Sequence, residues 1–569
     1  MSSKPAGLVY GVDESPPLAV NILSGVQHAG LMLISLMYAV LVAQAAGSSA
    51  KVIAAMVSLT LIAMAIGTIL QVIPMGPVGS GYLCQPSPSV IYLVPSLIAA
   101  RTGHLATVFG MTIVAGLAEV VLARVLPRLR ALFTPEITGL VVLLVGISSG
   151  VVGLRIAFGA ATAASAPSSV DVMLSLATLA LMVALNVWGR GALRLFCVLI
   201  GMAAGYLAAW ALGLLNTQEL AHMAAAPVFA TPATGHLSWS FDASLVLPFL
   251  VAAVAASLKV IGNVTTSQKA NQANWVRADM RSIGKGVMAD GLGNIVAGAI
   301  GSPGINSSTG SVGLATATGV ASRRIAYSIA AVLLVFAFVP KLGYLFNLMP
   351  RPVLAAALVF ASAFIITNGL VIVTSRLLDS RKILVIGLAI VFGLAVEIFP
   401  ALLAVFPPAL RPSLGNSLVF GTLVGLGLTL LFRIGLRRTV AMTVPAGRVD
   451  RDALDQFLDA QGAAWGARRD VIESAKFNLA QSIETLMGSG VADGPLVVEA
   501  AFDEFNLELR VSYDGERLEL PEVRPSLDEI VASDEGERKL AGYLLRRSAD
   551  RVAARRVGNR ATIVFHFDH

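Results

Sequence analysis

Apolar stretches of about twenty residues recur along most of this chain, and they constrain its fold more than any other feature. A run of this length crosses a bilayer as a single α-helix. The clear runs are 20–45, 52–73, 104–125, 135–153, 171–188, 195–214, 243–264, 325–340, 352–373, 382–405 and 416–434. Three shorter stretches, rich in Gly, Ser and Pro, are 86–99, 285–301 and 304–319. Together they predict an all-α polytopic membrane protein with fourteen spans.

The positions of the basic residues agree with this count. The chain has 41 Lys and Arg, and 25 of them precede residue 439. If the N-terminus is cytoplasmic, 18 of these 25 lie at cytoplasmic span ends, 6 lie outside, and Lys259 lies within a span. Such an excess of Lys and Arg is typical of cytoplasmic loops. We therefore expect a multi-pass protein of the bacterial inner membrane, with both termini cytoplasmic. Its positive charge would then face membrane lipid rather than nucleic acid.

The composition changes after Arg438. Residues 439–569 hold 16 Lys and Arg against 23 Asp and Glu, whereas only 11 Asp and Glu precede them. We predict a cytoplasmic N-terminal segment over 1–17, a transmembrane domain over 18–438, and a soluble cytoplasmic α/β domain over 439–569. The cysteines, Cys84 and Cys197, lack the spacing of metal ligands, so we expect no metal site.

Two of the interrupted stretches, 86–99 and 304–319, occupy equivalent places. They are the third and the tenth of fourteen, which an inverted repeat of seven plus seven spans predicts. Unpaired backbone costs several kcal/mol in lipid, so it survives only inside protein or along a cavity. We expect helix ends to meet there and to form a substrate site. The alternative is that Gly and Ser merely allow close helix packing.

Five short motifs follow one another on the predicted spans. They are Gln27-His28, Ser89–Pro95, FTPEITG at 133–139, Asp290–Gly293, and Gly313 with Thr318 and Ser322-Arg323. In this order they resemble the nucleobase–ascorbate transporters, the xanthine/uracil permease family, over residues 18–436. The resemblance implies a secondary active transporter rather than an enzyme, with no catalytic residues. It also implies a core domain that moves against a gate domain, coupling to an ion, and a homodimer as the expected assembly.

The expected substrate site departs from this family. The resemblance implies that a Glu in the eighth span and a Gln/Glu-Asn pair in the tenth bind the base. Here Lys259 stands at the Glu position, Asn263 at a nearby Asp position, and Gly310-Ser311 at the pair. A buried lysine offers only donors and needs an anion nearby. A purine anion of the urate or xanthine type therefore fits better than neutral uracil, unless Lys259 reaches out to an interface.

Further candidates complete the predicted site. Ser89 and Tyr92 are expected to bind substrate, although Tyr92 could also only fill space. Gln27, His28 and Asp290 are the candidate proton relay, with local structural roles as alternatives. The coupling ion, proton or sodium, stays open. Three other carboxyl groups inside the spans are alternative proton sites, although a structural role is favoured for each of them: Glu119, Glu136 and Glu397.

The tail shows patterns of a soluble domain. Residues 470–488 and 535–556 have the apolar spacing of helices. LVVEAAFD and LELRVSYDG alternate like paired strands with a turn near Glu504–Asn506, and ATIVFHF is a final strand. This order resembles the histidine-kinase-like ATPase domain of the anti-sigma-factor kinase type.

The nucleotide motifs of that ATPase domain are eroded in this tail. Ile483-Glu484 stand where the family has its magnesium-binding Asn, and Asp514-Gly515 lack the glycines that should follow. We expect no ATP cofactor, or only weak ATP binding, and a role in regulation or in recruiting a cytoplasmic partner. A regulatory tail of the sulfate-transporter type is the alternative.

Two other functions stay open at this point. One is a small-anion transporter of the sulfate-permease plan, which shares the arrangement of seven plus seven spans. The other is a membrane sensor that has lost transport and signals through its C-terminal domain.

Overall fold

The computed structural model divides the chain into two compact units. The first comprises Met1–Val373 and Leu388–Gly425, and the second Thr374–Gly387 and Leu426–His569. The predicted domain boundary at residue 438 stays a prediction. The structure describes residues 5, 8–73, 76–129, 135–158, 168–215, 217–273, 278–374, 378, 380–407, 411–432, 438–446, 450–465, 467, 469–488, 491–492, 494–502, 506–526, 529 and 534–568. Phe133 and Thr134 of the FTPEITG motif and the predicted turn at Glu504-Phe505 lie outside these residues.

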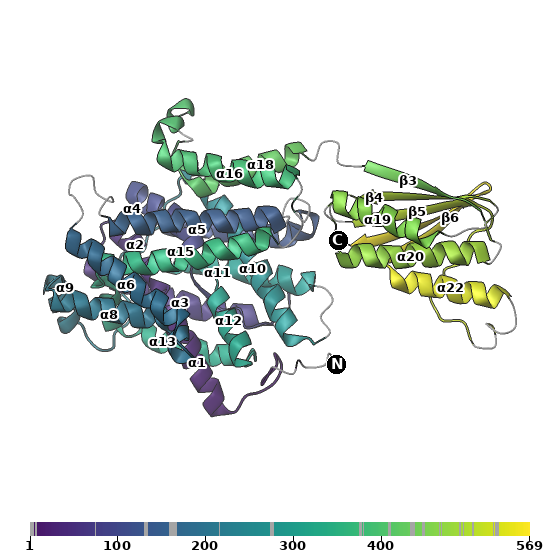
Figure 1. Ribbon diagram of the computed structural model, residues 1–569. Coiled ribbons are helices and arrows are strands. Elements are labelled where there is room, and N and C mark those ends of the chain that lie inside the picture. The colour runs from purple at the N-terminus through teal and green to yellow at the C-terminus, as the bar shows by residue number, and fades with distance from the viewer. Residues whose placement is uncertain are drawn as a thin grey trace. The chain divides into compact units, whose positions relative to one another are not determined.

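The apolar part of the chain is helical (Figure 1). Its helices are α1 (Leu18–Leu33), α2 (Leu36–Ala45), α3 (Ala50–Val72), α4 (Val90–Leu129), α5 (Pro135–Ala157), α6 (Ser169–Val187), α7 (Ala192–Leu195), α8 (Cys197–Ala211), α9 (Thr217–Ala225), α10 (Val246–Asn271), α11 (Met280–Ile300), α12 (Thr309–Thr318), α13 (Ile325–Ala337), α14 (Pro340–Asn347), α15 (Arg351–Val373), α16 (Ser380–Ile398), α17 (Arg411–Leu414) and α18 (Ser417–Phe432). Two 3₁₀ helices, η1 (Ala243–Leu245) and η2 (Pro400–Val405), accompany them.

Several of these helices are long enough to cross a membrane. Among the described residues, seven helices meet the requirements of length and apolarity, or eight if the bent pair α13–α14 forms one span. The helices α8 and α18 are apolar but shorter. The chain is therefore a multi-pass membrane protein, and the count of fourteen spans stays a prediction.

Three predicted segments have a different local shape. The stretch 20–45 breaks between α1 and α2, where the Ser35 hydroxyl donates to the Met32 carbonyl at 2.6 Å and competes with the helix ladder. The stretches 86–99 and 104–125 join in α4, which is interrupted at His104 with φ of 59°. The stretch around 325–340 bends by 78° where Pro340 begins α14.

Glycines bring α5 and α15 into backbone contact. A Cβ atom added at Gly139 would lie 2.5 Å from the Val373 nitrogen, and one at Gly146 would lie 2.8 Å from the Ile366 nitrogen. No side chain larger than hydrogen fits at such separations. Close approach through small residues is how helices associate where no water drives them together.

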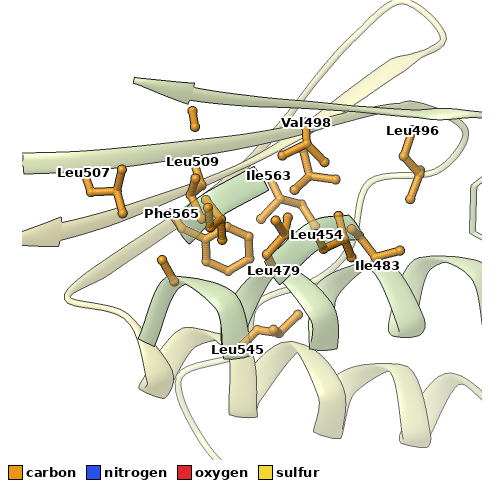
Figure 2. Packing of buried hydrophobic residues seen from close by; sticks show 14 of the residues in the cluster. Leu454, Leu479, Ile483, Leu496, Val498, Leu507, Leu509, Leu545, Ile563 and Phe565 are labelled. Atoms are coloured by element: carbon orange, nitrogen blue, oxygen red, sulfur yellow. The ribbon is translucent and has the colours of Figure 1, made fainter. Parts of the chain in front are cut away.

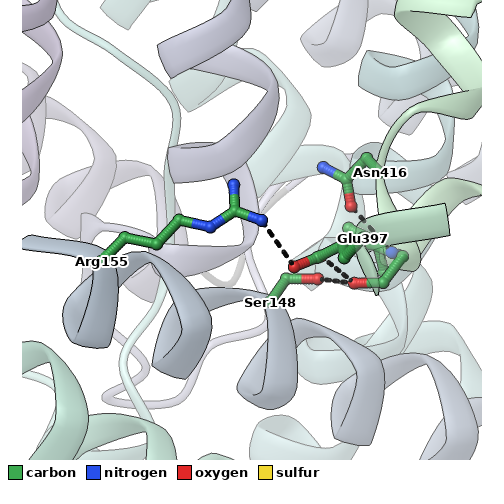
Figure 3. A network of polar contacts seen from close by, with 6 residues as sticks. Ser148, Arg155, Glu397 and Asn416 are labelled. Carbon is green, nitrogen blue, oxygen red and sulfur yellow. Dashed lines mark hydrogen bonds and ion pairs between the residues drawn. The ribbon is translucent and has the colours of Figure 1, made fainter. Parts of the chain in front are cut away.

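A polar cluster joins α5 to the ends of α16 and α18 (Figure 3). The Ser417 hydroxyl donates to Glu397 at 2.6 Å and lies 2.5 Å from the Ser148 hydroxyl. Arg155 approaches Glu397 at 3.8 Å, but its side chain is 54% exposed, so this ion pair adds little stability. The hydroxyl bonds therefore do most to fix these helix ends.

The N-terminal segment runs along the ends of α12 and α10. Tyr10 forms a parallel bridge with Val320, and the Val9 amide donates to the Gly319 carbonyl at 2.8 Å. The Val12 amide donates to Asn271 at 3.0 Å. These bonds connect the first residues of the chain to two helices that are distant in sequence.

The second unit contains a five-stranded antiparallel sheet in the order β3-β4-β5-β7-β6. Its strands are β3 (Arg438–Val444), β4 (Leu496–Phe502), β5 (Asn506–Asp514), β6 (Arg551–Val557) and β7 (Arg560–Asp568), and its helices are α19 (Arg451–Trp465), α20 (Arg469–Gly488) and α22 (Asp534–Ser548). Leucine, isoleucine and valine side chains from both layers fill the space between sheet and helices (Figure 2).

One prediction for this unit is wrong. The helix expected over 535–556 ends at Ser548, and residues 551–557 form β6. In β6 the side chain of Ala554 is buried, whereas Arg555 and Arg556 are exposed. Charged residues on an edge strand discourage pairing with further strands. Here they also interrupt the alternation of apolar and polar residues that is typical of a strand, so the segment resembles a charged helix. The elements β3 and α19 were not predicted, whereas α20, β4, β5 and β7 match the predicted helix and strands.

The contact between α5 and α15 leads to a stability prediction. Gly146→Ala should lower the free energy of unfolding by about 1–3 kcal/mol, the usual cost of overpacking. Thermal unfolding of purified protein in detergent measures this change. In the control Gly387→Ala no atom lies within 4 Å of the new methyl group, so its stability should not fall. Equal melting temperatures for both variants would contradict the close packing.

Candidate functional site

Two short strands meet inside the first unit. The strand β1 (Pro86–Pro88) pairs antiparallel with β2 (Ile305–Ser307), with Ser87 opposite Asn306. Pro86 and Pro88 hold the residues before them in extended conformation. All residues of both strands are buried. The structure thus brings together the two segments that the sequence predicted to be broken spans, and we call this element the strand pair.

Each strand leads directly into a helix, and the two connections mirror each other. The Ser89 amide donates to the Gly304 carbonyl at 3.1 Å, and the Ser308 amide donates to the Gln85 carbonyl at 2.9 Å. The Ser89 hydroxyl accepts from the Ile91 amide at 3.3 Å at the start of α4. Ser308 caps α12 in the same way. The positive ends of both helix dipoles therefore lie next to the strand pair.

The helix α10 contributes Lys259 and Asn263, which are one turn apart. The Asn263 amide donates to the Ser307 carbonyl at 3.1 Å and to its hydroxyl at 2.7 Å. Lys259 is half-buried and makes no hydrogen bond or ion pair with the described residues. Asp290 is the charged group that acts on it electrostatically. The structure therefore joins Asn263 to the strand pair and leaves the ammonium group of Lys259 without a direct partner among those residues.

Asp290 on α11 binds the other side of β2. It accepts from the Asn306 side chain at 2.7 Å and from the Ser307 amide at 3.1 Å. Asn306 also donates to the Ala256 carbonyl on α10 at 3.1 Å. Asp290, an expected proton-relay residue, thus lies in contact with the residues that form the strand pair.

Tyr92 is buried. Its hydroxyl donates to Glu119 on α4. Its ring lies close to Gly304, where an added Cβ atom would come within 2.3 Å of it. The Asn294 side chain donates to both Glu119 oxygens at 3.3 Å and accepts from the Ile305 amide at 2.8 Å. The described contacts thus place Tyr92 beside Glu119 and Gly304.

His28 on α1 reaches the strand pair from another side. Its Nδ1 lies 2.7 Å from the Gln85 side-chain nitrogen, and its side chain is buried. Gln27, its neighbour in the predicted relay, is only partly buried and has no hydrogen-bond partner among the described residues. The structure therefore places His28, but not Gln27, in contact with the strand pair.

Gly310 and Ser311 lie in the first turn of α12. A Cβ atom at Gly310 would have Leu31 as its nearest neighbour, at 3.5 Å, so the family's larger side chain would have room there. The Ser311 hydroxyl is buried without a hydrogen-bond partner among the described residues, as are the side-chain oxygens of Gln85 and Asn306. Buried polar atoms of this kind are available to a bound molecule.

Sequence reasoning missed several residues of this network. Asn294 is four residues after Asp290 and so lies on the same face of α11, a spacing that could have revealed it. Glu119 was an alternative proton site for which a structural role was favoured, and its partners Tyr92 and Asn294 were not predicted. Gln85, Asn306 and Ser307 belong to the interrupted segments, but nothing in their spacing indicates their partners.

The contacts of Asn263 generate a test. Asn263→Asp introduces the residue type that the family carries but places a carboxylate against the Ser307 carbonyl oxygen. We expect a loss of about 1–3 kcal/mol in the free energy of unfolding, because a buried acceptor loses its donor. Thermal unfolding over a range of pH measures it. The loss should shrink at low pH, where the protonated acid can donate, and a loss independent of pH would contradict the described geometry.

Several known transporters are similar to this chain. The E. coli K12 xanthine permease XanP is 32% identical over 373 residues, which cover 62% of this chain and 78% of XanP. The E. coli K12 uric acid transporter UacT is 28% identical over 59% of this chain and 70% of its own length. The solved structure of SLC26A9 covers 80% of this chain and 76% of its own, with a TM-score of 0.51 and 12% identity, which supports the fold alone. Residues 20–402 match the permease family of the xanthine/uracil type, and the chain belongs to this family.

Proposed function

We propose that this protein is a secondary active transporter of purine nucleobases, with a xanthine- or urate-type anion as its substrate. The observation that carries the proposal is the half-buried Lys259, one turn from Asn263 at the strand pair. Its ammonium group has no hydrogen bond or ion pair with any described residue. An unpaired charge inside a membrane protein is costly, so such residues mark binding sites and pathways.

The surroundings of Lys259 favour a planar anion. The starts of α4 and α12 add the positive ends of two helix dipoles. The Ser311 hydroxyl can donate or accept, and the free oxygens of Gln85 and Asn306 can accept ring N–H groups. A purine anion presents both N–H donors and carbonyl acceptors on one plane. The names of the relatives, which include xanthine permeases and a uric acid transporter, support the same substrate class.

The arrangement in the membrane is part of this proposal. The chain would cross the bacterial inner membrane fourteen times as two inverted repeats of seven spans, with both termini in the cytoplasm. The pairing of β1 with β2 supports this plan because equivalent segments of the two halves meet there. Transport would be coupled to a proton or sodium ion, by movement of a core domain against a gate domain in a homodimer.

The C-terminal domain would regulate transport or recruit a cytoplasmic partner. The absence of glycines after Asp514-Gly515 argues against tight nucleotide binding. Gly515 forms an isolated antiparallel bridge with Ala492, which holds this segment close to other backbone. We therefore propose a domain of ATPase-like ancestry that needs no ATP.

The substrate proposal is tested at Lys259. Lys259→Glu reverses the charge beside the strand pair, and we expect it to weaken competition by urate at least tenfold, the scale of a lost hydrogen bond to a charged group. Competition against uptake of labelled xanthine into reconstituted vesicles measures it. Neutral uracil should be affected less than urate.

A second lysine of the same helix supplies the control. Lys269 lies exposed in the last turn of α10, away from the strand pair, so Lys269→Glu should leave the order of competitors unchanged. An unchanged order in Lys259→Glu would remove Lys259 from the site. Competition by sulfate or bicarbonate, without competition by purines, would favour a small-anion transporter instead. Binding of xanthine without flux would favour a sensor.

Nucleotide binding by the tail is tested on the full-length protein. We expect its melting temperature to be the same with and without magnesium and ATP. A ligand present at a hundred times its dissociation constant would add about 2.7 kcal/mol of stability. A clear rise in melting temperature with millimolar ATP would therefore contradict this part of the proposal.

A further inference from the structure

Two acidic side chains meet in the interior of the first unit. Glu119 on α4 is fully buried, and Asp290 on α11 is 2% exposed. The helices touch at Gly116 and Gly291, where a Cβ atom on Gly291 would lie 2.8 Å from the Gly116 carbonyl oxygen. A Cβ atom on Gly291, the residue after Asp290, would also lie 2.9 Å from the Glu119 Cβ atom, so this close approach brings the two acidic residues side by side. We call these two residues the carboxyl pair.

Two buried carboxyl groups this close together, neither of them in an ion pair with the described residues, are stable only if one of them holds a proton. The remaining contacts agree with a single shared proton. Tyr92 and Asn294 donate to Glu119, and Asn306 and the Ser307 amide donate to Asp290. All four donors are neutral, so they can stabilise one negative charge but not two at contact distance.

Among the described residues, few other titratable groups face the carboxyl pair. Lys259 on α10 is the cation that acts on Asp290, and Cys84 and Tyr92 are the other groups whose charge it would influence. The Cys84 thiol is engaged with the Ser267 hydroxyl at 3.2 Å. One positive charge on Lys259 and one negative charge on the carboxyl pair leave this region neutral while the pair holds its proton.

We propose that the carboxyl pair is the proton-binding site through which this transporter is coupled, with Glu119 as its second member. The inference deepens the proposed function and rests on it. The pair is connected directly to the proposed substrate region. Asn306 and Ser307, which donate to Asp290, belong to β2. Asn294, which donates to Glu119, also accepts from the Ile305 amide of the same strand. Loss of the proton adds a second negative charge behind β2. That charge opposes a bound anion and changes the bonds that hold the strand.

Transport by the full-length protein in liposomes tests the pair. In wild type, an inward proton gradient of one pH unit should drive accumulation of labelled xanthine by roughly tenfold per coupled proton. Glu119→Gln keeps the shape and hydrogen-bonding capacity of the side chain but cannot bind a proton. It should still exchange labelled for unlabelled xanthine, yet no longer respond to the gradient. Glu397→Gln, which removes a carboxylate bonded to Ser417 outside the pair, should keep the response.

Infrared spectroscopy without substrate gives an independent measurement. Wild type at neutral pH should show the C=O stretch of a protonated carboxyl group. Tyr92→Phe should shift this band because it removes a donor to Glu119, and Glu397→Gln should leave it unchanged. A wild-type spectrum without such a band would overturn the proposal, whatever the fate of the Glu119 variant.

The two measurements separate the inference from the proposed function. Xanthine uptake by wild type that ignores the proton gradient would overturn the carboxyl pair as the coupling site, while the transport function stands. A gradient response that survives in Glu119→Gln would overturn it as well. If wild type carried no purine at all, the proposed function would fail, and the infrared band would still decide whether the pair holds a proton.

Discussion

The antiparallel pairing of β1 with β2 is the interaction on which the rest of the membrane unit depends. Backbone groups outside helices find no water inside a bilayer, so each needs a partner within the protein. The strand pair provides these partners for two interrupted spans at once, and the reciprocal bonds of Ser89 and Ser308 complete them. Two helices can then begin in the interior of the unit, where their N-terminal ends create a polar environment. Without the strand pair neither segment would have a stable place in the membrane.

The side chains around the strand pair fulfil a second requirement, which is the neutralisation of buried charge. Asn263, Asn294 and Asn306 join α10, α11 and β2 by neutral hydrogen bonds. Asn294 and Asn306 donate to two buried carboxyl groups, and Lys259 is the cation that acts on one of them, a combination that burial tolerates only when charges balance. Lys259 is therefore part of the electrostatics of this region. It changes the balance of charge that the neighbouring acids must meet.

The sequence predicted most helices of the membrane part because long apolar runs leave few alternatives in a bilayer. It also placed both interrupted segments, since Gly, Ser and Pro stand out against apolar surroundings. It could not predict which side chains meet there, because Glu119 and Asn294 are 175 residues apart and their contact depends on how α4 and α11 pack. In the C-terminal unit, β6 was mistaken for helix because Arg555 and Arg556 make an edge strand resemble a charged helix face. The short amphipathic helix α19 lacked a long apolar run and was overlooked.

The register of the strand pair has a consequence for how the protein is made. β1 ends at Pro88 and β2 ends at Ser307, 219 positions later, so β1 emerges from the ribosome long before β2 is complete. At about 5–20 residues per second, the delay is roughly 10–45 s. During this time β1 lacks its partner strand. Biogenesis must therefore pass through an intermediate that holds this segment at the translocation machinery, among lipid headgroups or with a chaperone until β2 arrives.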